Sequence, residues 1–143
     1  MRLYLLRHGK AEITSGPDSE RELTEKGKIQ ISEVSQHLDD VDLAVVSPYI
    51  RAQQTADIFL LNKQVGQRKE SETLIPNASI AEVMSWLEEV SSQSVLLISH
   101  NPLVTELAAW LTGDNMIRFG TGNLACLEGD YIGPRCLNVS WIK

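Results

Sequence analysis

The segment Leu3-Tyr4-Leu5-Leu6-Arg7-His8-Gly9 joins a short apolar run to an arginine, a histidine and a glycine. An apolar run of this length, bounded by polar residues, is typical of a buried β-strand. We expect the strand to cover residues 3–6, which leaves Arg7 and His8 at its carboxyl end. Two further apolar runs, at 42–46 and 94–99, are also expected to be buried strands.

Helical patterns alternate with these strands. Apolar residues recur with helical spacing at about 24–39, where Thr24 is the expected N-cap, and at about 80–90. Further helices are expected at about 47–61 and 101–111, because each segment opens with a good N-capping residue followed by proline.

The remaining segments complete an α/β pattern. Residues 116–142 contain Gly-Asn and Gly-Pro turn signals and are expected to form a pair of strands, whereas 64–76 is polar and irregular, with a short strand expected only near 73–75. Alternating strands and helices predict a three-layer αβα sandwich with a mostly parallel central sheet, to which the last two strands add an antiparallel edge. The 143 residues are expected to form one domain, 1–143.

The chain is acidic, since 13 Lys and Arg against 19 Asp and Glu give a net charge of −6. This charge disfavours binding to nucleic acid, which depends on cationic contacts with phosphates, and to anionic membrane surfaces. No apolar run approaches the roughly 20 residues of a membrane helix, and the N-terminus is charged too early for a signal peptide. Cys126 and Cys136 have no metal-site spacing and are expected to be reduced thiols in a cytoplasmic protein.

Polar residues, among them two arginines and two histidines, follow the three buried strands. In sheets of this kind ligands bind beyond the carboxyl ends of the strands, so two arginines and two histidines are expected to converge there. Helices that begin at Ser47 and Asn101 would also direct free N–H groups into this crevice. Guanidinium forks and helix N-termini suit a phosphate, and the pattern therefore predicts a phosphoryl site with histidine chemistry. The residues concerned are Arg7, His8, Gly9, Ser47, Arg51, Thr55, Ser99, His100 and Asn101.

The residue pattern alone leaves two classes of function open, a phosphate-handling enzyme and a passive anion-binding module. A single histidine at the end of a buried strand is more often a hydrogen-bonded core residue, so the prediction depends on the coincidence at three strand ends. His37, on the exposed face of a helix, is given no role. No phosphate-cradling glycine motif is present, and two histidines without a placed carboxylate make a poor zinc site, so neither a nucleotide nor a metal is expected.

The same residues resemble the motifs of a known family. The stretch 5–9 is similar to the signature of the histidine phosphatase superfamily, also called the phosphoglycerate-mutase-like family, and 21–27 resembles the segment after its first loop. Residues 46–56 resemble the second arginine motif of the family, and residues 97–102 resemble its second histidine motif. The resemblance implies the phosphoglycerate-mutase-like fold.

Within the superfamily, the likeness is to the small bacterial SixA-type phosphohistidine phosphatases. The chain is short, with no room for the cap insertion of the sugar-phosphate branches, and both Ala11-Glu12 and residues 122–127 are similar to the SixA pattern. Lys10 departs from the pattern, because an acidic residue is common at that position. The charge beside the pocket is therefore expected to differ.

The resemblance implies a covalent mechanism. His8 would be the nucleophile, and Arg7, Arg51 and His100 would stabilise the phosphoryl group during its transfer. Neighbouring arginines are expected to lower the pKa of His8 from its reference value of about 6.5, which keeps the attacking nitrogen unprotonated near neutral pH. Four further residues are expected to contact the substrate: Gly9, Arg21, Ser47 and Asn101.

The resemblance also bears on the substrate. Branches that act on phosphate esters carry a catalytic glutamate after the second arginine motif, and neither Glu72 nor Glu82 aligns with it, although Glu72 is the fallback. A phosphohistidine needs less acid assistance because its leaving group is an imidazole. The predicted function is a monomeric phosphohistidine phosphatase without metal or cofactor, which acts on a histidine phosphotransfer domain or phosphocarrier of a phosphorelay. The alternatives are a phosphatase for small phosphate monoesters and a non-catalytic phosphoprotein-binding module.

Overall fold

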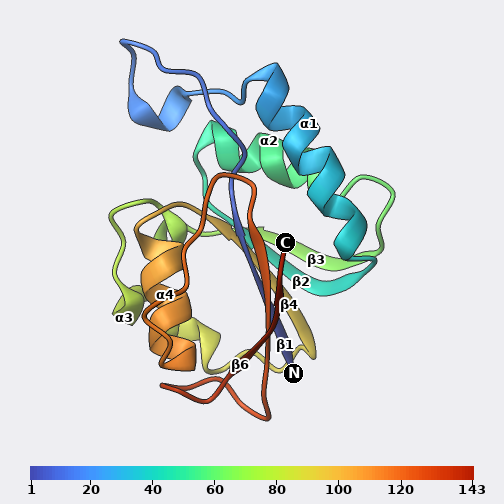
Figure 1. Ribbon diagram of the computed structural model, residues 1–143, viewed down its shortest axis with the longest axis vertical. Coiled ribbons are helices and arrows are strands. Elements are labelled where there is room, and N and C mark those ends of the chain that lie inside the picture. The colour runs from blue at the N-terminus through green and yellow to red at the C-terminus, as the bar shows by residue number, and fades with distance from the viewer.

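The computed structural model describes all 143 residues and places strand β1 (Arg2–Arg7) inside a six-stranded sheet, as its apolar sequence predicts. Strand β1 pairs in parallel with β4 (Ser94–Ser99) and antiparallel with β5 (Leu124–Glu128). The other strands are β2 (Val41–Val46), β3 (Val65–Glu70) and β6 (Asn138–Ile142). The order across the sheet is β3-β2-β4-β1-β5-β6 (Figure 1). The first four strands in this order are parallel and β5 and β6 form an antiparallel edge, which confirms the predicted sheet.

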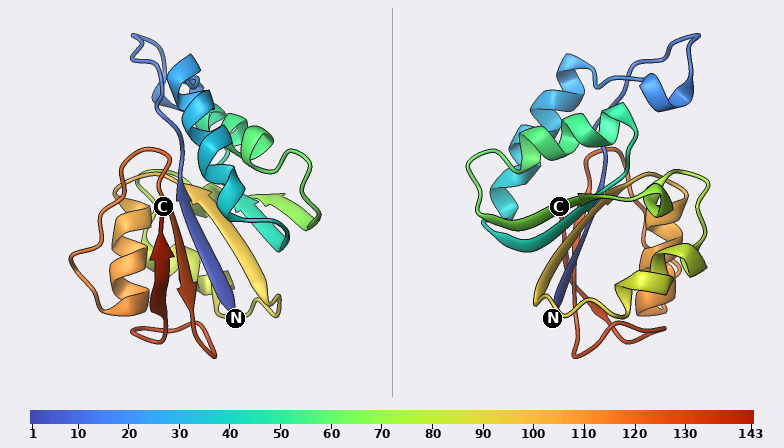
Figure 2. Two further views of the ribbon diagram at one scale, coloured as in Figure 1. Left: turned by 45° about the vertical axis from the view of Figure 1, so that its right-hand side comes forward. Right: turned by 180° about the vertical axis from the view of Figure 1, so that it is seen from behind.

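Helices cover both faces of the sheet, which makes the three predicted layers (Figures 1 and 2). Alternate side chains of β1 enter different cores: Leu3 and Leu5 pack with α3 and α4, whereas Tyr4 and Leu6 pack with α1 and α2. This alternation is the period of a strand that is buried on both faces. None of the helices is both long enough and apolar enough to cross a bilayer. Their bounds are α1 (Glu25–Val34), α2 (Ile50–Phe59), α3 (Ile80–Leu87) and α4 (Leu103–Thr112).

The segment 64–76 differs from its prediction. Residues 65–70 form strand β3, and the strand expected near 73–75 is wrong, because 72–74 is a short 3-10 helix. Strand β3 lies at the edge of the sheet and is almost entirely exposed, so its sequence carries no apolar run that would identify a strand. What defines this strand is its parallel pairing with β2, a contact between separate segments of the chain that a local sequence pattern does not reveal.

Two predicted helix caps are also wrong. Helix α2 begins at Ile50 and helix α4 at Leu103, so neither Ser47 nor Asn101 is an N-cap. The Ser47 hydroxyl contacts His100 instead, and the Asn101 amide donates to the Phe119 carbonyl. Both side chains therefore form tertiary hydrogen bonds at the carboxyl ends of the strands and do not cap a helix.

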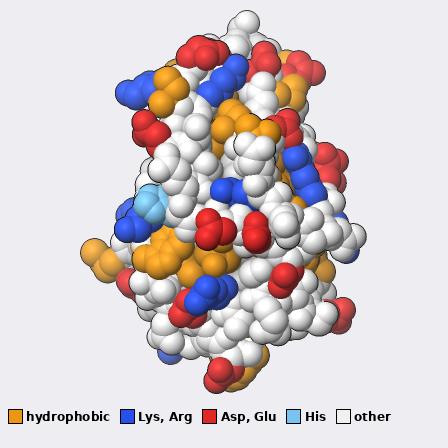
Figure 3. All heavy atoms as spheres, turned by 90° about the vertical axis from the view of Figure 1, so that its right-hand side faces the viewer, with side chains coloured by type: hydrophobic (Ala, Val, Ile, Leu, Met, Phe, Trp, Pro, Cys, Tyr) orange, Lys and Arg blue, Asp and Glu red, His pale blue; other side chains and the backbone are white.

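The cap of α1 is as expected, because the Thr24 hydroxyl accepts a hydrogen bond of 2.9 Å from the Gly27 N–H. The helix ends earlier than predicted, at Val34, and continues as the 3-10 helix Ser35–His37. Acidic and basic side chains are interspersed over the face of the molecule in Figure 3, with apolar groups between them. The excess of acidic residues is therefore not gathered into one patch on that face.

The chain that leaves β1 passes very close to helix α1. A Cβ atom added to Gly27 would lie 2.1 Å from the Lys10 carbonyl oxygen, and one added to Gly9 would lie 2.8 Å from the Gly27 carbonyl oxygen. Both contacts are with backbone atoms, which cannot move aside as a flexible side chain can. The two glycines therefore let helix α1 pack against the residue that follows His8.

We expect Gly27→Ala to lower the free energy of unfolding by about 1–3 kcal/mol, measured by urea denaturation. An alanine inside a helix would otherwise stabilise by roughly 0.5–1 kcal/mol relative to glycine, so the clash with Lys10 reverses the usual sign. The control is Gly16→Ala, whose added Cβ meets only the Thr14 hydroxyl oxygen, at 3.9 Å. Equal stability of Gly27→Ala and the wild type would refute this account of the packing.

Candidate active site

The carboxyl ends of the parallel strands bring the predicted residues together. His8 follows β1, Ser47 follows β2 and His100 follows β4, while Arg51 comes from the first turn of α2. The ring centroids of His8 and His100 are 5.0 Å apart. His8, Arg51 and His100 are only 6%, 3% and 1% exposed. A set of side chains that is polar and yet buried needs internal partners, and these partners define the chemistry of the site.

The hydrogen bonds of His8 determine its tautomer. Nδ1 lies 2.7 Å from the carbonyl oxygen of Gly9, which can only accept, so Nδ1 carries the proton. The neutral ring therefore has its lone pair on Nε2, and Arg51 Nε lies 3.3 Å from that atom. The Gly9 N–H donates to the Thr55 hydroxyl at 3.1 Å, which helps to hold the backbone of the residue whose carbonyl orients the ring. Thr55 is thus close to the site, as its place one turn beyond Arg51 predicts.

Both buried histidines are held in the neutral form. Burial lowers the pKa of His8 to about 4, and the positive charges of Arg51 and Arg7 act in the same direction. Burial also lowers the pKa of His100 to about 2, together with the nearby His8 and Arg51. At neutral pH His8 Nε2 is therefore unprotonated; its lone pair accepts from Arg51 Nε in the free site and can act as a nucleophile once a bound ligand takes over that donor.

Ser47 determines the tautomer of His100. The Ser47 hydroxyl oxygen accepts from the Tyr49 N–H at 3.3 Å and lies 2.7 Å from His100 Nε2. Nε2 is the only acceptor within hydrogen-bond distance of this buried hydroxyl, so the hydroxyl proton is directed at Nε2, and the neutral ring then carries its own proton on Nδ1. His100 Nδ1 is buried without a hydrogen-bond partner in the protein. It is a donor available to a bound ligand.

Arg7 is the second arginine of the site and is fixed at one end. Its Nη1 donates to the Phe119 carbonyl at 2.9 Å, and the Asn101 amide donates to the same oxygen, also at 2.9 Å. The Asn101 amide oxygen in turn accepts from the Thr105 hydroxyl, so both ends of the Asn101 side chain have protein partners. Arg7 Nε is buried without a partner. Together with His100 Nδ1 it provides two unpaired donors beside His8, a combination suited to an oxyanion.

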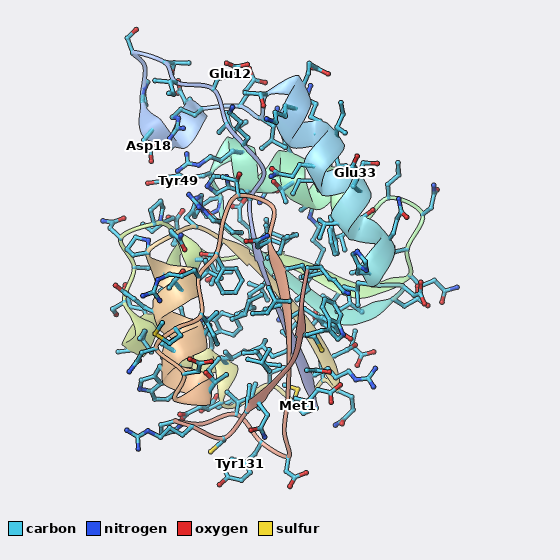
Figure 4. All side chains as sticks on the ribbon, in the orientation of Figure 1. Met1, Glu12, Asp18, Glu33, Tyr49 and Tyr131 are labelled. Carbon is cyan, nitrogen blue, oxygen red and sulfur yellow. The ribbon has the colours of Figure 1, made fainter.

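Asp18 belongs to the site but was not among the predicted residues. It lies on the 3-10 helix Asp18–Glu20, in the loop between β1 and α1 (Figure 4). Arg51 Nη2 donates to its carboxylate at 3.1 Å, and Arg51 Nη1 donates to its carbonyl oxygen at 2.6 Å. Arg21 Nη1 donates to the other carboxylate oxygen at 3.0 Å. These hydrogen bonds, first that of Arg21, hold the pKa of Asp18 below its ordinary value, so the carboxylate is ionised.

The site residues are closely packed at the strand ends. None of the cavities of the molecule is lined by His8, Arg51 or His100; a groove of about 460 Å³ lies elsewhere, between β2, β3 and α3. The side chain of Arg51 is 4% exposed and forms an ion pair with Asp18 of the loop between β1 and α1.

The remaining candidates lie outside this cluster. Arg21 is anchored by Asp18 and by the Glu12 carbonyl oxygen, and the side chain of Lys10 is exposed. The Glu82 carboxylate accepts from the Ser79 N–H in a capping box, and Glu72 is exposed on its 3-10 helix. Neither glutamate has a contact with the buried histidines. No group of three or more His, Cys, Asp or Glu side chains is arranged to hold a metal ion.

Comparison with known proteins agrees with this geometry. The family model of the histidine phosphatase superfamily (branch 1) matches residues 3–75, which is more than half of the chain. This chain belongs to the histidine phosphatase superfamily. It is 33% identical to the phosphohistidine phosphatase SixA homolog of Haemophilus influenzae, over 91% of this chain and 89% of that protein. It is 30% identical to phosphohistidine phosphatase SixA of Escherichia coli, over 96% and 91% of the two chains.

Solved structures of the superfamily confirm the fold. A structure of the protein histidine phosphatase SixA complexed with tungstate superposes with a TM-score of 0.88 at 27% identity, covering 99% of this chain and 96% of that one. The α-ribazole phosphatase structure from Shigella flexneri has a TM-score of 0.69 at 21% identity, covering 96% of each chain, and shows the shared fold only. The predicted family and the phosphoglycerate-mutase-like α/β fold are thus confirmed.

The depressed pKa of His8 makes stability depend on pH. In the unfolded chain a histidine takes up a proton below about pH 6.5, whereas folded His8 stays neutral down to about pH 4, so the free energy of unfolding falls as the pH drops through this window. We expect the fall to be shallower in His8→Gln by up to about 1.4 kcal/mol per pH unit. Urea denaturation between pH 6.5 and pH 4.5 measures the two slopes, and parallel slopes would show that His8 is not held neutral.

Proposed function

We propose that this protein is a phosphohistidine phosphatase, a hydrolase that removes the phosphoryl group from a phosphohistidine of another protein through a covalent intermediate on His8. One observation carries the proposal: a neutral imidazole, its Nδ1 proton held by Gly9, has its Nε2 beside Arg51, feels the charge of Arg7, and lies next to a second neutral histidine. The similarity to the SixA proteins, which are named phosphohistidine phosphatases, supports the substrate class.

The phosphoryl oxygens would be held by donors that the fold has already oriented. Arg7 Nε and His100 Nδ1 are buried and unpaired, and Arg51 Nε lies next to the nucleophilic nitrogen. Because phosphoryl transfer develops charge on the equatorial oxygens, fixed cationic and N–H donors in a dry site stabilise its transition state. Ser47 acts on His100 and Asn101 on the Phe119–Arg7 contact, so both are positioning residues.

In the first step His8 Nε2 attacks phosphorus in line. A P–N bond to His8 forms while the P–N bond to the substrate histidine breaks, and the substrate ring, protonated on its other nitrogen, leaves as a neutral imidazole. One P–N bond is exchanged for another of the same kind, so the step needs no strong acid. The Gly9 carbonyl keeps the Nδ1 proton and stabilises the imidazolium character that His8 acquires.

In the second step water attacks the phosphorus of phospho-His8. A P–O bond forms, the P–N bond breaks, and the electron pair returns to Nε2, which restores the neutral nucleophile. One water proton remains on the inorganic phosphate and the other passes to solvent.

The position of the glutamates favours an imidazole leaving group. A phosphate monoester leaves as an alkoxide, which needs a proton from a nearby acid. Glu82 caps helix α3 and Glu72 is exposed, so neither is placed to supply that proton. The ionised Asp18 is not a proton donor either. This arrangement supports P–N over P–O cleavage.

The partner follows from the same chemistry. We propose a phosphorelay protein, a histidine phosphotransfer domain or phosphocarrier, as substrate. We further propose that the enzyme works as a monomer in the cytoplasm. A reducing compartment suits the two free cysteines, Cys126 and Cys136.

The decisive experiment is transfer of ³²P from a histidine-phosphorylated phosphocarrier, in the presence of EDTA. The wild type should acquire a transient label that is labile to acid and stable to base, and should release inorganic phosphate. In His8→Ala both the label and the release should be lost. The control is His37→Ala, which alters an exposed histidine on the 3-10 helix Ser35–His37 and should behave as the wild type.

Three results would refute the proposal. Undiminished phosphate release by His8→Ala would show that His8 is not the nucleophile. Ready hydrolysis of p-nitrophenyl phosphate or sugar phosphates, without preference for the phosphohistidine protein, would show a phosphatase for small monoesters. Phosphoprotein binding without any release of phosphate would indicate the non-catalytic module.

A further inference from the structure

The loop that covers the site places a carboxylate on the phosphate-binding arginine. Asp18 accepts from Arg51 through its carboxylate and its carbonyl oxygen, while Arg51 Nε faces His8. Three of the five N–H groups of this guanidinium therefore already have protein partners. An incoming phosphoryl group has to compete with one of these partners for the positive charge of Arg51.

We propose that Asp18 is an internal counter-anion that must leave Arg51 when a phosphoryl group binds and that returns to expel the product, so that it weakens the binding of free inorganic phosphate. The inference rests on the proposed function, because it assigns a specificity role within the same site. Asp18 is a carboxylate where the substrate brings a phosphate, and both are oxyanions that a guanidinium binds.

Burial shows which partner moves. The side chain of Arg51 is 4% exposed and that of Asp18 is 55% exposed, so the arginine is fixed by the fold and the aspartate is not. Asp18 lies on a three-residue 3-10 helix that contains no buried residue. Withdrawal of Asp18 into solvent therefore exposes no core, and its carboxylate regains water as it leaves.

The chain around Asp18 limits the movement to residues 13–21. At the base of this loop, Ala11 pairs with Leu23 in an isolated bridge, and the Glu12 N–H donates to the Glu22 carbonyl at 2.8 Å. Arg21 connects the base to the tip, because its Nε donates to the Glu12 carbonyl and its Nη1 to Asp18. Figure 4 shows Glu12 at the base of this loop and Asp18 near its tip, with Tyr49, the residue before α2, on the side of Asp18 that faces the sheet. Arg21 thus holds Asp18 over the site when no phosphoryl group is bound.

A competing anion and a purely supporting one predict opposite effects. If Asp18 competes with phosphate, removal of its charge strengthens phosphate binding. If Asp18 only holds Arg51 in its orientation, removal of the charge frees the guanidinium and weakens phosphate binding. The exposed position of Asp18 and the burial of Arg51 favour the first outcome.

The test is titration of inorganic phosphate into the wild type, Asp18→Asn and Asp18→Ala by isothermal calorimetry. Both variants should bind phosphate about three- to tenfold more tightly, which corresponds to about 0.7–1.4 kcal/mol of competing ion-pair energy. The matched control is Glu20→Gln, which removes the same charge from an exposed side chain of the same 3-10 helix and should change the affinity less than about twofold.

Three results would overturn the proposal. Equal or weaker phosphate binding by both Asp18 variants would make Asp18 a support for Arg51. An equal gain in phosphate affinity in Glu20→Gln would show that the effect comes from the net charge of the protein and not from the contact of Asp18 with Arg51. If no variant bound phosphate detectably, there would be no competition between Asp18 and phosphate. The titration measures phosphate binding without turnover. If the ³²P experiment gave no label on His8, the proposed phosphatase activity would be refuted, but the comparison of phosphate affinities would still test the role of Asp18.

Discussion

The site depends on a single residue, Gly9. Its carbonyl oxygen accepts the Nδ1 proton of His8, its N–H donates to Thr55 on α2, and its Cα lies against Gly27 of α1. The backbone of this one residue therefore connects the end of the central strand to the two helices on one face of the sheet. A side chain at this position would meet the backbone of α1, so the glycine is required by packing as well as by the orientation of the nucleophile.

The second constraint is electrostatic. An acidic protein of net charge −6 places the buried Arg51 and the half-buried Arg7 beside two buried histidines, and both imidazoles stay neutral in this cluster. The neutral form of both imidazoles is also the form that phosphoryl transfer requires, because the reaction needs a lone pair on the ring of His8 and an N–H donor on the ring of His100. Asp18 balances part of the arginine charge from the solvent side. Stability of the free site and binding of the substrate are thus linked through the same guanidinium of Arg51.

The buried central strands could be predicted from the sequence, whereas the exposed edge strand and the loop that carries Asp18 could not. Buried strands such as β1 and β4 have apolar runs and end in the site residues, so their convergence follows from parallel topology alone. Strand β3 was missed because an exposed edge strand needs no apolar pattern, and Asp18 was missed because its role arises only when its loop folds back onto α2. Ser47 and Asn101 were assigned as helix caps, and only the tertiary structure gives their side chains other partners.

The central claim is that the Gly9 carbonyl fixes neutral His8 as the Nδ1–H tautomer and leaves Nε2 as the nucleophile. Long-range ¹H–¹⁵N correlation of the ¹⁵N-labelled protein at neutral pH, with the His8 signals assigned by comparison with His8→Gln, measures this directly. We predict a protonated-type signal for Nδ1 and an unprotonated-type signal for Nε2. A proton on Nε2, or protons on both nitrogens, would contradict the account.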